Sequence, residues 1–291
     1  QASFGFGLPA DNVPVFNEIA LRWFDQYLKE MDVGADTIPN VTQYVTGLEH
    51  FVTSSDWPHP RAFAQRLYLQ PNKTLSTSIP QVSSSSHTML QQPLDGLCSV
   101  STAQWTGGLL GLIPTPCTTD NRIADALSIS YQTAPMEEDY YINGPMQADI
   151  WMATTASDAS LSVRISDVSP SGAAVPLSNG LQAVSFRKVD ESRSRKLDGQ
   201  SIQPWHPFTA DSVLPVTPNE PVLVPVEIFT TSAVVAKGHS LRVSIGPSNL
   251  PQGIPSLPTL LQSLLGTITI YNDAKHPSSL VLPIVPPDEL L

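Results

Sequence analysis

The sequence LSVRISDV at residues 161–168, followed by SPSG at residues 169–172, is the stretch that decides the fold class. A short run rich in apolar and β-branched residues predicts a strand, and a Ser-Pro-Ser-Gly run predicts a turn. The same pattern, short runs of apolar and β-branched residues, begins near residue 126 and continues toward the C-terminus. It predicts further strands at 127–132, 146–154, 173–177, 181–189, 222–229, 240–245, 267–271 and 280–284.

Turn signals separate these strands, and the pattern leaves no room for long helices between them. The signals are Asn143-Gly144-Pro145, Ser178-Asn179-Gly180 and Lys237-Gly238. Many short strands with such turns predict a mainly β fold, a β-sandwich of the jelly-roll type. We also expect one short helix at 257–265 and a surface loop at 76–93, where a Ser-rich run has no apolar period.

The composition restricts the partners of the chain. Only 14% of the 291 residues are charged and the formal net charge is −11, which argues against nucleic acid or an anionic membrane as a partner. No apolar run approaches the roughly 18 residues that a membrane span needs. Within the β region, cross-strand ion pairs are expected among Asp158, Arg164, Asp167 and Arg187.

Residues 14–31, which include LRWFDQYLK at 21–29, predict an amphipathic helix ahead of the β region. Apolar residues recur at steps of three and four and give a wide stripe. They are Phe16, Ile19, Ala20, Trp23 and Tyr27. Strands at 41–47 and 65–69 follow the helix. Because so aromatic a helix needs a large surface to bury against, we expect this chain to be the back part of a larger protein.

Two cysteines, Cys98 and Cys117, flank a Gly-, Thr- and Pro-rich stretch. We predict a disulfide between them, which in the chain-entropy model stabilises the fold by roughly 3 kcal/mol. The alternative is a pair of unrelated buried thiols. A disulfide in a chain of low charge favours a protein that is secreted or held in the cell envelope. The sequons Asn40-Val41-Thr42 and Asn72-Lys73-Thr74 have meaning only in a eukaryotic secretory protein.

The sequence contains no self-sufficient active site. It lacks the G-x-S-x-G pentad that exposes a hydrolase serine, and its six histidines are scattered without metal-ligand spacing. No metal site and no cofactor are therefore predicted. His206, in Trp205-His206-Pro207-Phe208, and His239, at the entry of the strand at 240–245, are of the kind that more often packs or anchors a turn than catalyses.

Several short motifs occur in a familiar order along almost the whole chain. They are LRWFDQYLK at 21–29, Asp56-Trp57-Pro58, INGP at 142–145, VRISDVSPSG at 163–172, His206-Pro207-Phe208 and GHSLRV at 238–243. This ordered set resembles the CocE/NonD hydrolases, the relatives of cocaine esterase and X-Pro dipeptidyl-peptidase. Residues 76–120, with the Ser-rich run and both cysteines, have no recognised counterpart in that pattern.

The resemblance implies an α/β-hydrolase domain that carries a catalytic serine, aspartate and histidine, with a C-terminal jelly roll packed against it. Residues 1–60 are then the C-terminal end of the hydrolase domain, a helix and strand remnant, and residues 61–291 are the jelly roll. The family's triad lies upstream of the helix at 14–31, so we expect all three catalytic residues before residue 1 and none in this chain.

The function expected from this resemblance is that of the non-catalytic C-terminal portion of a serine hydrolase. The parent enzyme would act on small ester or X-Pro peptide substrates, and this chain, inactive alone, would buttress the upstream domain. Trp205, His206 and Phe208 are candidates for a wall of the substrate pocket. The sequence does not decide whether the protein forms a homo-oligomer. The alternative function is a stand-alone jelly-roll module that binds a carbohydrate or a protein.

Overall fold

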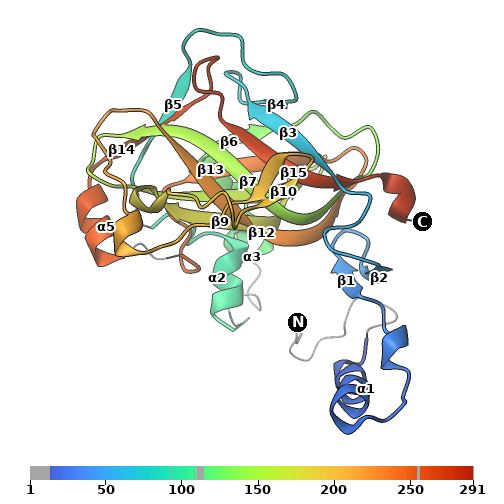
Figure 1. Ribbon diagram of the computed structural model, residues 1–291. Coiled ribbons are helices and arrows are strands. Elements are labelled where there is room, and N and C mark those ends of the chain that lie inside the picture. Colours follow the sequence, from blue (N-terminus) through green and yellow to red (C-terminus); the bar gives the residue numbers. More distant parts are fainter. Residues whose placement is uncertain (1–13, 93, 108, 110–114, 254–255, 291) are drawn as a thin grey trace.

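The computed structural model describes residues 14–92, 94–107, 109, 115–253 and 256–290. The body of this region is a sandwich of a seven-stranded and a four-stranded β-sheet, with a small N-terminal arm below it in Figure 1. The mainly β fold predicted from the strand pattern is confirmed. Among the helices within those ranges, none is long and apolar enough to cross a membrane.

The larger sheet is organised around its longest strand, β7. One edge of β7 pairs with β12 along most of its length, and the other edge pairs first with β15 and then with β14. Beyond these, β3 and β4 extend one side and β5 the other, with every pair antiparallel. The strands are β3 (Phe63–Leu69), β4 (Leu75–Ser76), β5 (Ser86–Leu90), β7 (Tyr140–Thr154), β12 (Val222–Val235), β14 (Thr267–Tyr271) and β15 (Ser279–Val285).

The smaller sheet has the order β6-β13-β8-β9 and is also antiparallel. Its strands are β6 (Ile129–Gln132), β8 (Ser160–Val168), β9 (Ala174–Ala183) and β13 (Ser240–Gly246). At one edge β9 crosses β12 of the larger sheet, where Thr231 Oγ1 donates a hydrogen bond to Leu177 O at 3.3 Å. A side chain at Gly180 would place its Cβ 2.0 Å from Glu227 O, so this crossing requires glycine.

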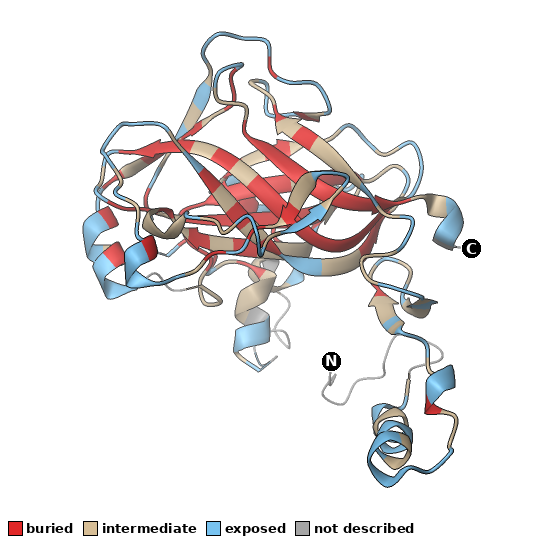
Figure 2. Cartoon of the chain, viewed as in Figure 1, coloured by how far each residue is buried: buried red, intermediate tan, exposed pale blue. Residues whose placement is uncertain are grey.

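The core fills the space between the two sheets, as the red interior of Figure 2 shows. Alternate residues of each strand point inward, which is the period expected of strands with one buried face. Fully buried members include Ile150, Met152, Leu161, Val163, Ile165, Val226, Ile228, Leu241, Val243, Ile245, Ile268 and Leu282.

The N-terminal arm comprises α1 (Phe16–Lys29), the 3-10 turn η1 (Ala35–Thr37) and the hairpin of β1 (Val41–Val45) and β2 (His50–Ser54). A second, small core joins this hairpin to the sandwich through Val45, Tyr141, Val234 and Val285. The helix predicted at 14–31 is present and ends at Glu30, which adopts the left-handed conformation with φ 57°.

Short elements outside the two sheets decorate the body. They are α2 (Val100–Trp105), α3 (Pro116–Thr119), α4 (Arg122–Ala126), α5 (Leu257–Ser263), the hairpin β10 (Arg195–Leu197) and β11 (Gln200–Gln203), and the 3-10 turns η3 (Val184–Phe186), η4 (Ala210–Ser212) and η5 (Pro287–Leu290). The helix predicted at 257–265 is therefore present as the shorter α5.

Two predicted turns are wrong. Residues 178–180 lie inside β9, where Gly180 serves the close crossing rather than a turn, and residues 143–145 lie inside β7. Gly144 has φ +138° and faces a register shift between β7 and β12, so this glycine permits an irregularity within a continuing strand. The strand predicted at 181–189 instead ends at Ala183 and passes into η3.

The surface loop predicted at 76–93 is also partly wrong, because residues 86–90 form β5 at the edge of the larger sheet. Only His87 and Met89 of this strand are shielded from solvent, and Met89 packs against the main core. An edge strand with two inward side chains among polar neighbours leaves a weak pattern in the sequence.

Candidate functional site

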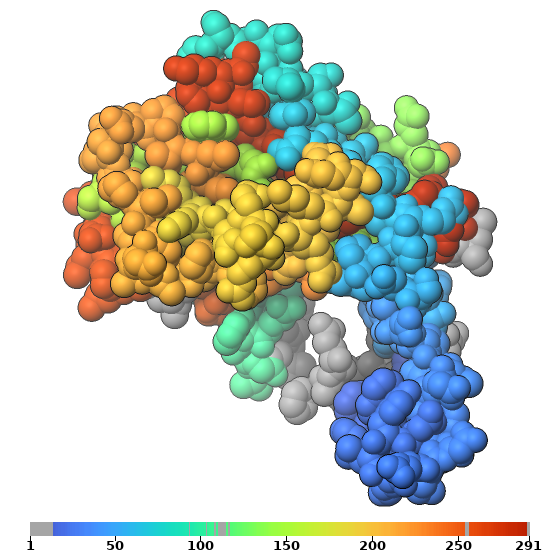
Figure 3. Space-filling view, viewed as in Figure 1, coloured from blue at the N-terminus to red at the C-terminus, as the bar shows by residue number. Residues whose placement is uncertain are grey.

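The most exposed apolar surface of the arm lies on α1, none of whose residues is buried. Trp23 and Phe24 are 49% and 53% exposed, and Trp23 contacts Tyr27 at a ring-centroid distance of 4.5 Å. The other large exposed apolar side chains of α1 and its flanks are Val15, Phe16, Leu21, Tyr27, Leu28 and Met31. We call the set on α1 itself the α1 apolar face. Figures 1 and 3 show that this part of the arm stands away from the sandwich.

Polar contacts fix the orientation of α1 from its other side. Arg22 Nη2 donates to Gly34 O at 2.5 Å, and Ala35 N donates to Gln26 Oε1, also at 2.5 Å. Lys29 pairs with Asp25 at 2.6 Å across one helical turn. Since these contacts hold the polar side against Gly34 and η1, the α1 apolar face is left open to solvent.

The three pocket-wall candidates do not share one cavity. Phe208 is exposed and lines a pocket of about 230 Å³ together with Phe186, Leu161 and Leu181. Trp205 is half exposed but lies outside that lining, and the Arg193 guanidinium stacks over its ring at 3.9 Å.

His206 has a structural environment. It is buried, and its ring Nδ1 hydrogen-bonds to Lys188 O at 3.0 Å. Burial lowers the pKa of the His206 imidazole from its ordinary value. The neutral ring therefore ties the loop at 205–208 to residue 188, and Phe208 alone of the three candidates reaches the pocket.

No catalytic triad is present in the part of the chain that the structure describes. His239 Nδ1 contacts Asp167 Oδ1 at 2.9 Å, which is the base-and-orienter half of such a triad. Among the described residues, however, no serine hydroxyl hydrogen-bonds to a histidine ring, and no group of three or more His, Cys, Asp or Glu side chains could hold a metal. The His239–Asp167 pair joins the residue before β13 to β8.

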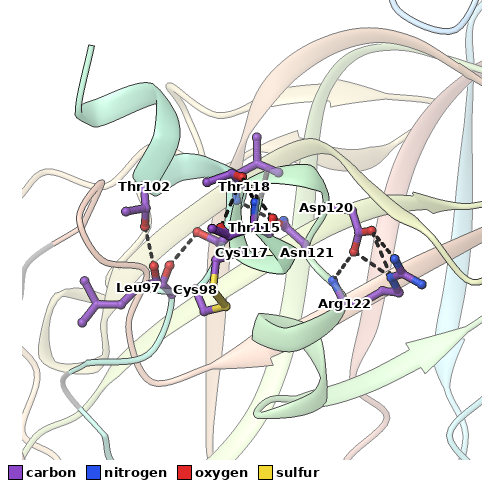
Figure 4. The surroundings of a disulfide bond; sticks show 12 residues. Leu97, Cys98, Thr102, Thr115, Cys117, Thr118, Asp120, Asn121 and Arg122 are labelled. Carbon is purple, nitrogen blue, oxygen red and sulfur yellow. Dashed lines mark hydrogen bonds and ion pairs between the residues drawn. A yellow bond between two sulfur atoms is a disulfide. The ribbon is translucent and has the colours of Figure 1, made fainter. Parts of the chain in front are cut away.

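A disulfide joins Cys98 and Cys117, and Figure 4 shows the hydrogen bonds around it. Thr102 Oγ1 donates to Leu97 O at 2.6 Å, and Val100 N donates to the Asn121 side chain at 3.1 Å. The Asn121 backbone N donates in turn to Ala174 O at 2.8 Å, which attaches this segment to β9.

Beneath this segment lies a buried cluster of charges on the outer face of the smaller sheet. Arg164 of β8 is 2% exposed and faces Asp95 at 3.4 Å and Asp125 at 3.6 Å. Arg242 of β13 approaches Asp125 from the other side at 3.5 Å. Burial raises the pKa of the Asp125 carboxyl, and the charges of Arg164 and Arg242 oppose that rise.

The cross-strand ion pairs predicted from sequence are wrong. Arg164 pairs with Asp95 and Asp125 rather than with Asp158 or Asp167. Asp158 accepts hydrogen bonds from Ser185, and Asp167 contacts His239. Arg187 donates to the backbone carbonyls of residues 184, 214 and 215.

Comparison with known proteins assigns most of the chain to a family. Residues 33–281 match the family described as the X-Pro dipeptidyl-peptidase C-terminal non-catalytic domain. The chain belongs to that family. The mainly β fold and the non-catalytic role predicted above are thereby confirmed.

Individual relatives agree with the assignment. The chain is 25% identical over 269 residues to a Mycobacterium bovis protein that is provisionally named a serine esterase, covering 92% of this chain and 41% of that protein. It is 24% identical over 288 residues to the cocaine esterase of a Rhodococcus species, covering 90% of this chain and 45% of that enzyme. The chain thus spans less than half the length of these relatives.

A solved structure shows the same fold. The CocE/NonD family hydrolase of Staphylococcus aureus superposes with a TM-score of 0.68 at 23% identity, over 92% of this chain and 46% of that one.

Proposed function

We propose that this chain is the non-catalytic portion of a serine hydrolase that acts on ester or X-Pro peptide bonds. In this proposal residues 1–60 complete an α/β-hydrolase domain and residues 61–291 form the domain that buttresses it. The observation that carries the proposal is the α1 apolar face, whose large side chains stay exposed in the part of the chain that the structure describes. Solvent-exposed apolar surface of this kind, rimmed by polar residues, marks an interaction site.

The roles of the upstream domain and of this chain follow from the residues that acyl transfer requires. Acyl transfer needs a nucleophilic serine, a histidine to move its proton, and backbone amides that hold the oxyanion. The upstream domain would supply these groups, while this chain would hold that domain through α1. The loop at 205–208, with the exposed rings of Trp205 and Phe208, is our candidate for a wall of the substrate pocket.

Covalent labelling tests the proposal. The purified chain is treated with a fluorophosphonate, which reacts with activated serines, and assayed on a p-nitrophenyl ester. We expect neither labelling nor turnover from residues 1–291. The longer polypeptide containing the hydrolase domain should be labelled at one serine outside this range. A labelled serine inside residues 1–291 would refute the proposal.

The alternative, a stand-alone binding module for a carbohydrate or protein, is not favoured by the family match. The exposed aromatic side chains Phe16, Trp23, Phe24 and Tyr27 share one helix of the arm, whereas Phe63, Trp105, Trp205, Phe208 and Phe229 are spread over different elements. A partner other than a hydrolase domain, including a second copy of this chain, would have to cover the same α1 apolar face.

A further inference from the structure

Two Asn-X-Thr sequons, which begin at Asn40 and Asn72, have no part in the proposed hydrolase function. An N-linked glycan is bulky and strongly hydrated, so a sequon can carry one only where the folded chain leaves the asparagine side chain open to solvent. Both asparagines are exposed, and they differ instead in the hydrogen bonds of their side-chain nitrogens and in their place in the fold.

Asn72 lies at the tip of the turn that joins β3 to β4. Lys73 N donates to Gln70 O at 3.0 Å and Gln70 N donates to Thr74 O at 2.9 Å, which closes the turn. All three residues of the sequon, Asn72, Lys73 and Thr74, are exposed. In Figure 1 β3 and β4 lie at the top of the sandwich and α1 lies below it, so a glycan here leaves the α1 apolar face free.

The side chain of Asn72 is held in a form that leaves its nitrogen available. Thr74 Oγ1 donates to Asn72 Oδ1 at 2.7 Å, and Thr74 N donates to the same oxygen at 3.3 Å. Asn72 Nδ2 makes no hydrogen bond to any residue that the structure describes. The threonine of the sequon therefore orients the amide through its oxygen and turns its nitrogen outward.

Asn40 is exposed as well, but its nitrogen is hydrogen-bonded and it lies elsewhere in the fold. Its Nδ2 donates to Ser55 O at 2.8 Å, and this bond ties the chain before β1 to the chain after β2. It also lies in the arm, on the segment that leads from α1 to the sandwich. A glycan at Asn40 would stand beside the surface that we propose to be covered by the hydrolase domain.

We propose that Asn72 carries an N-linked glycan, attached in an oxidising secretory compartment. The Cys98–Cys117 disulfide fits the same compartment, since disulfides persist where the environment is oxidising. In the transfer, Asn72 Nδ2 forms a bond to C1 of the first sugar of a lipid-pyrophosphate-linked oligosaccharide. The bond from C1 to the pyrophosphate oxygen breaks, the lipid pyrophosphate leaves with the electron pair, and a base of the transferase takes the amide proton.

The glycan would also protect a sheet edge. The two-residue strand β4 lies at one end of the larger sheet, next to Asn72 in sequence. Thr74, just before it, forms an isolated bridge with Gln132 of β6, and β4 itself pairs only with β3 among the described residues. Exposed strand edges invite pairing with other chains, and bulky polar groups beside them prevent it. A hydrated oligosaccharide on the adjoining turn has that effect.

The test is site-resolved mass spectrometry of the whole chain, secreted from a eukaryotic host with a signal peptide. We expect glycan on the peptide that contains Asn72, and its release by peptide N-glycosidase with conversion of Asn72 to aspartate. Thr74→Ala and Asn72→Gln should lose this mass, and Thr74→Ser should keep it.

The occupancy of the wild-type chain decides the matter even if a variant folds poorly. Secreted wild-type protein with an unmodified Asn72 peptide, or with glycan on Asn40 alone, would overturn the proposal. Labelling by a fluorophosphonate does not affect this result, so it can fail or succeed independently of the hydrolase function.

Discussion

Replacement of Arg164 by methionine tests the buried charge cluster, and we expect it to lower the free energy of unfolding by about 3–5 kcal/mol. The guanidinium is 2% exposed, lies within 3.6 Å of Asp95 and Asp125, and donates to Ala124 O at 3.1 Å. Methionine fills much of the volume but leaves two carboxylates buried with less compensating charge. The cost arises from those carboxylates rather than from lost packing.

Urea unfolding followed by circular dichroism at neutral pH measures this change. The matched control is Arg61→Met, since Arg61 pairs with Asp288 at 2.9 Å and both side chains are exposed, at 51% and 60%. We expect the free energy of unfolding of that variant to stay close to that of the wild type. Because burial raises the pKa of Asp125 above its ordinary 3.8, acid neutralises this carboxyl early, and the cost of Arg164→Met should shrink as the pH falls toward 4.

Two results would refute the reasoning. One is an Arg164→Met variant as stable as the wild type at neutral pH. The other is a combined Arg164→Met, Asp95→Asn, Asp125→Asn variant that is no more stable than Arg164→Met alone, because neutralising the carboxylates should recover most of the loss.

Three further predictions concern other parts of the chain. In this chain alone Phe24→Ala should change the free energy of unfolding by less than about 0.5 kcal/mol, against about 2–5 kcal/mol for Ile165→Ala in the core, as measured by urea titration. Reduction of the Cys98–Cys117 disulfide, whose sequence separation is 19, should lower the free energy of unfolding by at most about 3 kcal/mol. The shift of the urea midpoint on adding reductant measures this, and the double variant Cys98→Ser, Cys117→Ser, which has no disulfide to reduce, is the control. Since burial lowers the pKa of His206, the stability that depends on its neutral ring is complete above pH 6.5, and the free energy of unfolding falls below that pH by up to about 1.4 kcal/mol per pH unit. The free energy of unfolding of His206→Gln, measured by urea titration, should depend less steeply on pH, and an unchanged dependence would contradict this.

The sandwich was predictable because its strands are regular. The predicted strands at 161–168, 240–245 and 267–271 match β8, β13 and β14 to within one residue at each end. Errors arose where a residue has a local turn preference that tertiary packing overrides. Gly180 reads as a turn glycine, yet it is required by the passage of β9 over β12, and a contact between strands far apart in sequence leaves no local signal.

The buried charge cluster could not be predicted either, because its members are far apart in the sequence. Asp95 and Asp125 flank the disulfide-linked segment 98–117 and lie 69 and 39 positions from Arg164 in the sequence, so strand spacing suggested the nearer Asp158 and Asp167 instead. The one available signal was Arg164 itself, an arginine between Ser162 and Ser166 on a strand whose outer face is therefore small and polar. Such a face can accept a covering segment.

Hydrogen exchange of the α1 amides tests the central claim, that the α1 apolar face is covered by a hydrolase domain. Burial of the exposed halves of Trp23 and Phe24, about 100 Å² each, is worth about 5 kcal/mol in total at 25 cal/mol per Å². In the chain alone, residues 16–29 should exchange rapidly, since an isolated helix of this length is marginal. In the longer polypeptide with the hydrolase domain we expect exchange slowed by at least about a hundredfold. Equal exchange rates in the two forms would contradict the account.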